Sequence, residues 1–390
     1  MQVKADLSYQ AKTWNIRAQL ASYKCRTFMP ELSDARLYFD LPETFALRRG
    51  GTLTGVCLAY ETWGKLSAAK DNVVVLYTGM SPSAHAAQHP DDLSPGWWED
   101  MVGPGKPIDT QRWFVICANS LGSCRGSTGP ASINPLTGKA YRMDFPELSV
   151  EDIASATYKL LRHLGIESVK VAVGCSMGGM STLAHAALFP GHAEHAILMC
   201  TAARAEAFAI AIRSLQRQLV MNDSNFQNGN YLRSVDVNSG MGLARKLGVI
   251  SYRSAEEWRA RFGRQRIQAP SGAAFATEFE VERYLQGHAD RWAGSFDPCS
   301  YVYLSRAMDW FDFSALKPSG QERFFKRALI LGVATDILFP LSQQAELAQQ
   351  LARTGTQVSF SALPSIQGHD AFLVDMENFG PAVARFISAL

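Results

Sequence analysis

The sequence of 390 residues lacks three features that would point to a particular class of protein. No apolar run reaches the roughly 20 residues that a helix needs to span a bilayer. Neither sign of charge is in excess, because 38 basic residues face 36 acidic ones, so a nucleic acid is not expected as a partner. The seven cysteines are scattered without a CxxC pair, which argues against a disulfide framework and a zinc site.

The N-terminus also lacks the apolar segment of a secretory signal, since residues 1–24 mix charged and amide side chains with apolar ones. Residues 1–30 show no strong periodicity, and we expect them to form an N-terminal arm. Together with the scattered cysteines, these features predict a cytoplasmic protein with no membrane partner. An apolar fraction of 47% is ordinary for a chain with a sizeable core.

From about residue 36, short β-rich runs alternate with helical patterns. Candidate strands lie at 36–39, 56–60, 73–77, 113–118, 169–173, 196–200, 328–332 and 357–362. Candidate helices lie at 150–164, 178–189 and 342–353. The later candidate strands are continuous apolar runs, as expected for strands buried on both faces of a parallel sheet. The alternation predicts an α/β fold with a mostly parallel central sheet flanked by helices.

The alternation stops between residues 203 and 313. This stretch is helix-like, rich in arginine, glutamine and aromatic residues, and contains no strong strand before the run at 328–332. We predict a helical lid at 203–313, inserted into an α/β core formed by 31–202 and 314–390. The lid is expected to project over the C-terminal edge of the strands.

Residues 174–178 read Gly-Cys-Ser-Met-Gly, a G-x-S-x-G element between a candidate strand and a candidate helix. Such a nucleophile elbow needs a strand that leads through a sharp turn into a helix, and glycine permits the close backbone approach. The helix N-terminus favours negative charge near Ser176. The alternative is a tight turn with a solvated serine, but the strand and helix on either side favour a nucleophile.

Two later residues follow strands in the order that this chemistry requires. Asp336 lies four residues after the run at 328–332, and His369 follows the last run. We predict that His369 takes the serine proton and later returns one to the leaving group. Asp336 is predicted to fix the imidazole tautomer and to stabilise the imidazolium.

The oxyanion hole is assigned to two backbone amides. One is that of Met177, directly after the serine, and the other is that of Met80, in the loop after the run at 73–77. His85 lies in the same loop, and its role is left open. Cys175 is expected to be only a small residue in the elbow.

Several longer segments, in order along the chain, carry a resemblance to a known family. They are PGWWEDMVGPGKPIDT at 95–110, NSLGSCRGSTGPASINP at 119–135, GCSMGGM at 174–180, YLSRAMDWFD at 303–312 and QGHDAFLVD at 367–375. These segments resemble the homoserine/serine O-acyltransferases of the α/β-hydrolase superfamily, and the resemblance extends over about 36–390. It implies an α/β-hydrolase fold and a ping-pong transfer from acyl-CoA through Ser176 to the hydroxyl of a small amino acid.

The resemblance also implies the residues that bind the acceptor. Arg245 matches the arginine that grips the substrate carboxylate, and Asp370 matches the aspartate that holds its ammonium. A guanidinium and a carboxylate placed apart would select a zwitterion over a simple alcohol. Without the family, Arg245 could instead be a surface charge on a helix.

Three departures from the homoserine O-acetyltransferase pattern resemble the serine O-succinyltransferase branch, which feeds cysteine synthesis. The loop of the oxyanion amide differs at Thr78, Gly79, Met80 and Ser81. Ser181 replaces a usual glutamine, and Arg213 stands where an asparagine is usual. A succinyl donor carries a distal carboxylate, whose burial is costly unless it is paired, so we expect Arg213 to bind it. The alternative for Arg213 is a lid arginine that faces solvent.

Succinyl-CoA, or else acetyl-CoA, is therefore expected as a co-substrate, with no bound cofactor and no metal. Serine rather than homoserine rests on the branch alone, because one methylene discriminates by only about 1–3 kcal/mol. An L-homoserine or L-serine O-acetyltransferase is the alternative, and a serine esterase or a non-catalytic binding protein are further ones. Relatives in the family suggest a homodimer built through the lid helices.

Overall fold

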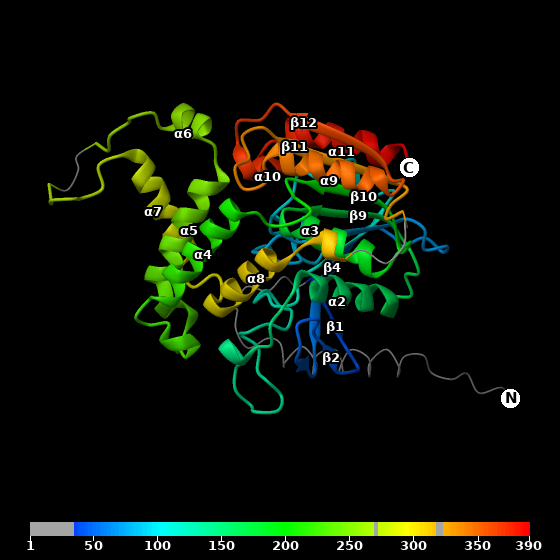
Figure 1. The fold of residues 1–390 in the computed structure, drawn as a ribbon, viewed down its shortest axis with the longest axis horizontal. Helices are drawn as coiled ribbons and strands as arrows, with labels where there is room; N and C mark the ends of the chain where they lie inside the picture. Colours follow the sequence, from blue (N-terminus) through cyan, green and yellow to red (C-terminus); the bar gives the residue numbers. More distant parts are fainter. Residues whose placement is uncertain (1–34, 269–271, 317–322) are drawn as a thin grey trace.

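The computed structural model describes residues 35–268, 272–316 and 323–390 (Figure 1). The N-terminal arm predicted at 1–30 lies outside the described residues. The rest of the predicted core and lid falls almost entirely within them, so the placement of every candidate site residue can be followed.

An eight-stranded sheet forms the centre of the fold, in the order β1-β4-β8-β5-β9-β10-β11-β12. Its strands are β1 (Leu37–Asp40), β4 (Cys57–Trp63), β5 (Val73–Tyr77), β8 (Phe114–Ala118), β9 (Val169–Cys175), β10 (Ala193–Met199), β11 (Arg327–Val333) and β12 (Gln357–Leu363). The β1–β4 and β4–β8 pairs are antiparallel, and all other neighbours in the sheet are parallel. The predicted mostly parallel sheet is confirmed. Four two-residue strands that were not predicted form small pairs outside it: β2 (Phe45–Ala46), β3 (Thr52–Leu53), β6 (Val102–Gly103) and β7 (Ile108–Asp109).

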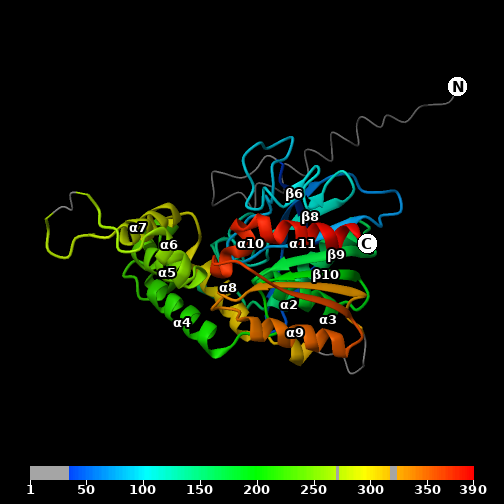
Figure 2. The ribbon, with the colours of Figure 1, turned by 90° about the horizontal axis from the view of Figure 1, so that it is seen from above.

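Helices cover both faces of the sheet. Figure 2 shows α11 (Met376–Ser388) on one face and α2 (Val150–His163), α3 (Met177–Leu188) and α9 (Leu341–Arg353) on the other. Two hydrophobic cores result, one on each face. The central strand β5 is buried throughout because it lies between them.

Strand β12 departs from the predicted burial on both faces. It lies at the edge of the sheet, is paired only with β11, and is mostly exposed. The prediction was wrong for this strand because its polar residues, Gln357, Ser359 and Ser361, belong to an edge with one neighbour.

The described residues between 203 and 313 contain helices and no strand of the sheet. The helices are α4 (Ala207–Met221), α5 (Asn238–Tyr252), α6 (Ala255–Arg261), α7 (Glu280–Trp292) and α8 (Pro298–Trp310). Figure 1 shows α4, α5 and α7 gathered at one end of the sheet, apart from the helices that flank it. The division of the chain into a lid at 203–313 and a core around it stays a prediction.

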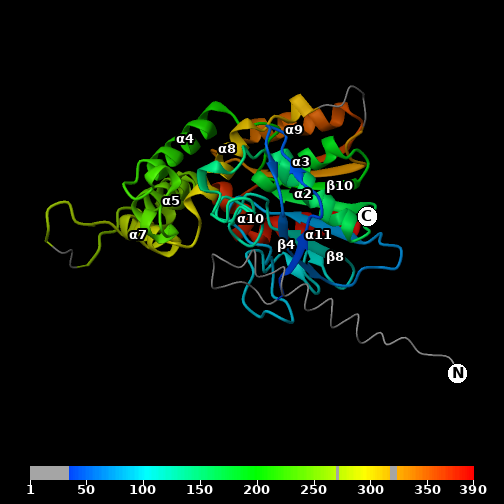
Figure 3. The same cartoon turned by 90° about the horizontal axis from the view of Figure 1, so that it is seen from below.

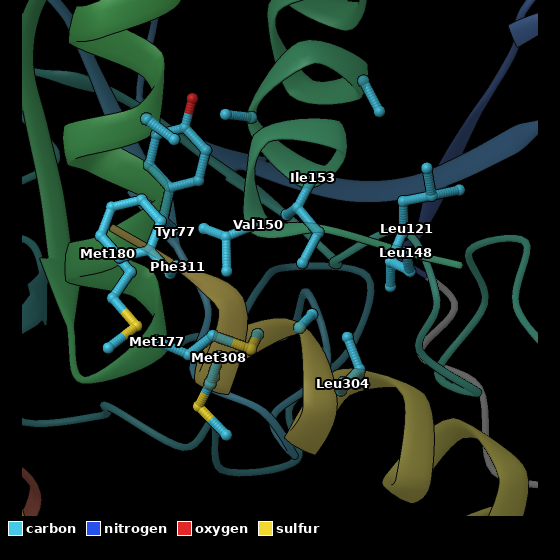
Figure 4. Packing of buried hydrophobic residues seen from close by; sticks show 14 of the residues in the cluster. Tyr77, Leu121, Leu148, Val150, Ile153, Met177, Met180, Leu304, Met308 and Phe311 are labelled. Atoms are coloured by element: carbon cyan, nitrogen blue, oxygen red, sulfur yellow. The ribbon is translucent and has the colours of Figure 1, made fainter. Parts of the chain in front are cut away.

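Helix α8 connects these helices to the core. Its Leu304 and Met308, with Phe311 just beyond it, pack beside Met177 and Met180 of α3 (Figure 4). The start of α8 is fixed by the fully buried Asp297, which binds polar groups from three other positions. They are the hydroxyl of Tyr231, the hydroxyl of Ser234 and the guanidinium of Arg142. The base of this group of helices is therefore continuous with the core under the nucleophile elbow.

Candidate active site

Ser176 lies in a strained turn between β9 and α3. Its φ of 55° and ψ of −122° are values that a residue with a side chain rarely adopts. The backbone is held on both sides: the Ser176 N–H donates to the Met199 carbonyl at 3.0 Å, and the Ser176 carbonyl accepts from Thr201 Oγ1 at 2.8 Å. This is the geometry of a nucleophile elbow, in which the serine hydroxyl is exposed at the end of the sheet.

The two glycines of the elbow allow backbone to touch backbone. A Cβ at Gly174 would lie 2.1 Å from the Gly178 carbonyl oxygen, and a Cβ at Gly178 would lie 2.1 Å from the Tyr77 carbonyl oxygen. Any larger residue would force β9, α3 and the end of β5 apart. The G-x-S-x-G spacing is thus a requirement of packing as well as of chemistry.

The structure brings the three predicted triad residues into one hydrogen-bonded chain. Ser176 Oγ lies 2.9 Å from His369 Nε2, and His369 Nδ1 lies 2.8 Å from Asp336 Oδ2. The other carboxylate oxygen of Asp336 accepts from the N–H groups of Leu338 and Phe339, both at 2.9 Å. With both oxygens engaged, the buried carboxylate has a single orientation and directs the imidazole at the serine.

The loops that carry Asp336 and His369 are bonded to each other. Thr335 Oγ1 donates to the Ser365 carbonyl at 2.9 Å and accepts from the Gly368 N–H at 3.1 Å. Thr335 directly precedes Asp336 and Gly368 directly precedes His369, so these bonds hold the two triad residues at a fixed distance from each other.

Two opposing effects act on the pKa of His369. Burial alone would lower this pKa, but the charge of Asp336, its hydrogen bond and the charge of Asp370 outweigh burial, and the pKa lies above its ordinary value. A raised pKa makes the imidazole a stronger base for the serine proton.

A cavity of about 170 Å³ opens directly onto Ser176 and His369. Helices α4, α5 and α8 form its far wall. It collects most of the predicted site residues, namely Gly79, Met80, Ser81, Ser176, Arg213, Arg245, His369 and Asp370. Thr78 does not line it, because this buried side chain bonds to Ser120 Oγ at 3.0 Å. Met177 begins α3 beside the serine, and the assignment of its amide and that of Met80 to an oxyanion hole stays a prediction.

Arg213 is buried in the wall of this cavity and does not face solvent. Its Nε donates to Asp309 Oδ1 at 2.6 Å, while Asp309 Oδ2 pairs with Arg217 Nη2 at 2.7 Å. Arg213 Nη2 is buried and has no hydrogen-bond partner in the described part of the chain. The guanidinium is therefore held at Nε by an aspartate that it shares with a second arginine, while Nη2 still has hydrogen-bonding capacity for a ligand.

Arg245 and Asp370 line another part of the same cavity. The Arg245 guanidinium lies 4.8 Å above the centre of the Trp292 ring, a cation–π contact that leaves its donors free to bind a ligand. Asp370 pairs with Arg253 Nη2 at 3.3 Å. Burial raises the pKa of Asp370 above its ordinary value, although the charges of Arg253, His369 and Arg245 oppose this.

His85, whose role was left open, does not line the cavity. Its Nδ1 lies 2.7 Å from Glu61 Oε2 and its Nε2 lies 2.8 Å from the Ser94 carbonyl. A carboxylate and a carbonyl are both acceptors, so this environment favours the protonated imidazole. The hydrogen bond to Glu61 accordingly raises the pKa of His85. Its position is that of a loop anchor.

Sequence reasoning missed four side chains of the site. Tyr252, Tyr301 and Trp292 line the cavity, and Asp309 fixes Arg213. Tyr252 could have been found, because it lies seven residues after Arg245 on a helix and so shares its face. Trp292 and Tyr301 come from separate helices, and no spacing in the sequence joins them to the site.

Metal-binding clusters, reactive cysteines and membrane-spanning helices are the features that would indicate a different kind of protein. Across residues 35–268, 272–316 and 323–390, no cluster of three or more histidine, cysteine, aspartate or glutamate side chains could hold a metal ion. The six cysteines in these ranges are buried. None of the described helices is long and apolar enough to cross a membrane.

Comparison with known proteins agrees with this geometry. A family model described as the alpha/beta hydrolase fold matches residues 73–375. A serine O-succinyltransferase from Frateuria aurantia is 54% identical over 92% of this chain and 100% of its own length. An L-serine/homoserine O-acetyltransferase from Streptomyces lavendulae is 53% identical over 93% of this chain and 99% of its own.

Among solved structures, homoserine O-acetyltransferase from Bacillus anthracis superposes with a TM-score of 0.82 at 25% identity, over 90% of this chain and 97% of the other. The similarity therefore extends over most of both chains. The chain belongs to the α/β-hydrolase-fold family and, within it, to the enzymes that include the serine and homoserine O-acyltransferases.

Proposed function

We propose that this enzyme is an L-serine O-succinyltransferase that works through an acyl-Ser176 intermediate. The observation that carries the proposal is Arg213, which lines the same cavity as Ser176 and His369 and whose buried Nη2 has no hydrogen-bond partner in the described part of the chain. A reactive serine together with a fixed cation suits an acyl group that ends in a carboxylate.

In the first half-reaction, Ser176 Oγ attacks the thioester carbonyl while His369 Nε2 takes the serine proton. The amides of Met80 and Met177 would stabilise the tetrahedral oxyanion. Collapse of this intermediate breaks the carbon–sulfur bond, and His369 returns the proton to the departing thiol of CoA. Asp336, held by two backbone N–H groups, stabilises the imidazolium in between.

In the second half-reaction, the acceptor hydroxyl gives its proton to His369 and attacks the acyl-enzyme. Arg245 would hold the acceptor carboxylate and Asp370 its ammonium. Their positions in one cavity support selection of a zwitterion. Water has no carboxylate or ammonium for Arg245 and Asp370 to bind, so these two residues favour transfer to an amino acid over hydrolysis. They therefore argue against a simple esterase.

The second candidate is an L-serine or L-homoserine O-acetyltransferase, which the 53% identical Streptomyces relative supports. The two candidates differ in the acyl group and not in the triad. An acetyl donor would leave the buried Arg213 Nη2 without a partner, a cost of about 1–3 kcal/mol or more for a charged group. This cost favours the succinyl donor.

A two-by-two assay tests the proposal, with succinyl-CoA or acetyl-CoA as donor and L-serine or L-homoserine as acceptor. The release of CoA is followed for each pair. We expect the highest kcat/KM for succinyl-CoA with serine. A preference for acetyl-CoA with homoserine would keep the fold and the triad and would overturn the assignment of Arg213.

We also propose a homodimer formed through the lid. Helices α4 and α5 lie side by side (Figure 3) and carry exposed apolar residues spaced by seven. They are Phe208 and Leu215 on α4, and Leu243 and Ile250 on α5. Such a stripe on two adjacent helices suits the isologous contact of a second copy. A cytoplasmic location is proposed as well, supported by the seven scattered cysteines, an odd number without a CxxC pair.

The double substitution Leu215→Lys and Leu243→Lys is expected to convert the dimer to a monomer. Each lysine would occur in both copies, so the twofold contact would have to bury four unpaired charges. The mass in solution, measured by light scattering, checks this. Leu136, a more exposed leucine outside the lid, provides the control: its change to lysine should leave the mass unchanged. A monomeric wild-type protein would contradict the proposal.

A further inference from the structure

The loop that carries His369 is packed against the junction between α5 and α6. At Gly368, whose φ is +66°, a Cβ would lie 2.7 Å from the Tyr252 carbonyl oxygen and 3.0 Å from backbone atoms of Arg253 and Ser254. Ser254 Oγ also donates to the Ile366 carbonyl. The lid and the histidine loop therefore meet with backbone against backbone at this point.

Arg253 is the charged residue of this junction. Its Nη1 lies 3.2 Å from Glu257 Oε1 and 3.4 Å from Gln367 Oε1, and its Nη2 lies 3.3 Å from Asp370 Oδ2. Only 13% of its side chain is exposed. Asp370 lines the cavity, whereas Arg253 does not. The guanidinium thus lies behind the carboxylate as seen from the cavity.

We infer that Arg253 is a positioning residue for the acceptor amino acid: from behind, it holds the Asp370 carboxylate in its charged form and in one orientation, so that the substrate ammonium can bind from the cavity side. This inference rests on the proposed function, because Arg253 would support a residue that binds the acceptor and would not touch the acceptor itself. A carboxylate with two lone-pair oxygens can serve a guanidinium on one side and an ammonium on the other.

The charges around Asp370 explain why it needs such support. Burial raises the pKa of this carboxyl, and the nearby carboxylate of Glu257 raises it further. Arg253 is the first of the charges that oppose burial, before His369 and Arg245. Two of these cations have other tasks, since His369 changes its charge during turnover and Arg245 would be neutralised by the acceptor carboxylate. Arg253 alone would stay a cation beside Asp370 throughout the cycle.

Loss of Arg253 is expected to change the pH range in which the acceptor binds. Without this guanidinium the pKa of Asp370 rises, so the carboxyl is protonated, and unable to bind an ammonium, at higher pH than before. The acceptor is then bound well only above this new pKa. An opposite charge at this distance is worth about 1–3 pKa units.

Ping-pong kinetics separate this effect from the titration of His369. The kcat/KM for succinyl-CoA reports the first half-reaction, which needs His369 and not Asp370. The kcat/KM for L-serine reports the second, which needs both. Both quantities are measured against pH for the full-length wild-type enzyme, for Arg253→Met and for a control, Arg261→Met.

The control is matched, because Arg261 Nη1 binds the same Glu257 Oε1 at 3.0 Å and, within the described residues, makes no hydrogen bond or ion pair with Asp370. For Arg253→Met we expect the acid limb of kcat/KM for serine to move up by about 1–2 pH units. The acid limb for succinyl-CoA should not move up, because the loss of charge on Asp370 can only lower the pKa of His369. Arg261→Met should move neither. Arg253→Lys, which keeps the charge and loses the fork, should place the serine limb between those of the wild type and Arg253→Met.

A melting temperature for each variant guards against a purely structural effect. If Arg253→Met does not fold, Arg253→Lys alone still decides, because its serine limb must move up while its succinyl-CoA limb does not. The inference is overturned if the serine limb stays in place, or if both limbs move up together. Absence of any acyl transfer to an amino acid by the wild-type enzyme would instead overturn the proposed function.

Discussion

Replacement of Ser176 with alanine is expected to lower kcat by about 10⁴-fold or more, and Asp336→Asn by about 10⁴-fold. The first change removes the atom that becomes acylated. The second keeps the shape of the site, but an amide can donate to His369 Nδ1 and so favour the wrong tautomer at the 2.9 Å contact with Ser176. Rates of CoA release with saturating substrates measure both losses.

Labelling by a serine-reactive phosphonate provides the control for this prediction. Wild type should be labelled and Ser176→Ala should not. Ser181 lies in the same helix and bonds through its hydroxyl to the Met177 carbonyl at 3.2 Å, so Ser181→Ala should keep the label. Loss of the label in that variant, or its persistence in Ser176→Ala, would place the nucleophile elsewhere.

The same chain of residues predicts how the first half-reaction depends on pH. His369 must be neutral to accept the serine proton, and its pKa is raised by Asp336 and Asp370 against the effect of burial. Activity should therefore be lost as the pH falls through a value above the ordinary pKa of the imidazole, about 6.5.

Replacement of Arg213 with asparagine is expected to lower kcat/KM for succinyl-CoA by about 10- to 100-fold and to change that for acetyl-CoA far less. The reason is the loss of a charged hydrogen bond to the succinyl carboxylate, worth about 1.5–3 kcal/mol. Asp309 keeps its ion pair with Arg217 at 2.7 Å in this variant, so the aspartate is not left alone. The ratio of the two kcat/KM values is the measurement.

Arg217→Met is the matched control for this second prediction. Arg217 shares Asp309 with Arg213, but it does not line the cavity. Its loss should reduce the melting temperature and leave the donor preference unchanged. An equal change of donor preference in both variants would mean that the ion-pair network, and not the free Nη2 of Arg213, decides the donor.

The sheet and the serine–histidine–aspartate chain could be read from the sequence because both rest on local patterns. Each of the eight candidate strands corresponds to a strand of the sheet. The order serine, aspartate, histidine after successive strands was enough to expect Asp336 and His369 beside Ser176, and hydrogen bonds join all three.

Features that depend on one neighbour at long range could not be read in this way. The exposure of β12 follows from its place at the sheet edge, where β11 is its one neighbour. Thr78 turns away from the cavity because Ser120, 42 positions later, binds it. The contacts of Arg253 with Asp370 and of Arg213 with Asp309 join segments about 100 residues apart, and a charged residue does not reveal its partner.

The backbone of Ser176 has a consequence for the evolution of this enzyme. A residue with a side chain at φ 55° and ψ −122° costs the native state about 1–3 kcal/mol, a noticeable part of the stability margin of a domain. Glycine would relieve that strain, but it would also delete the proposed nucleophile. Selection for heat resistance and selection for turnover therefore pull in opposite directions at this one position, and an ancestor or engineered variant that had lost its activity could gain stability there by a single substitution.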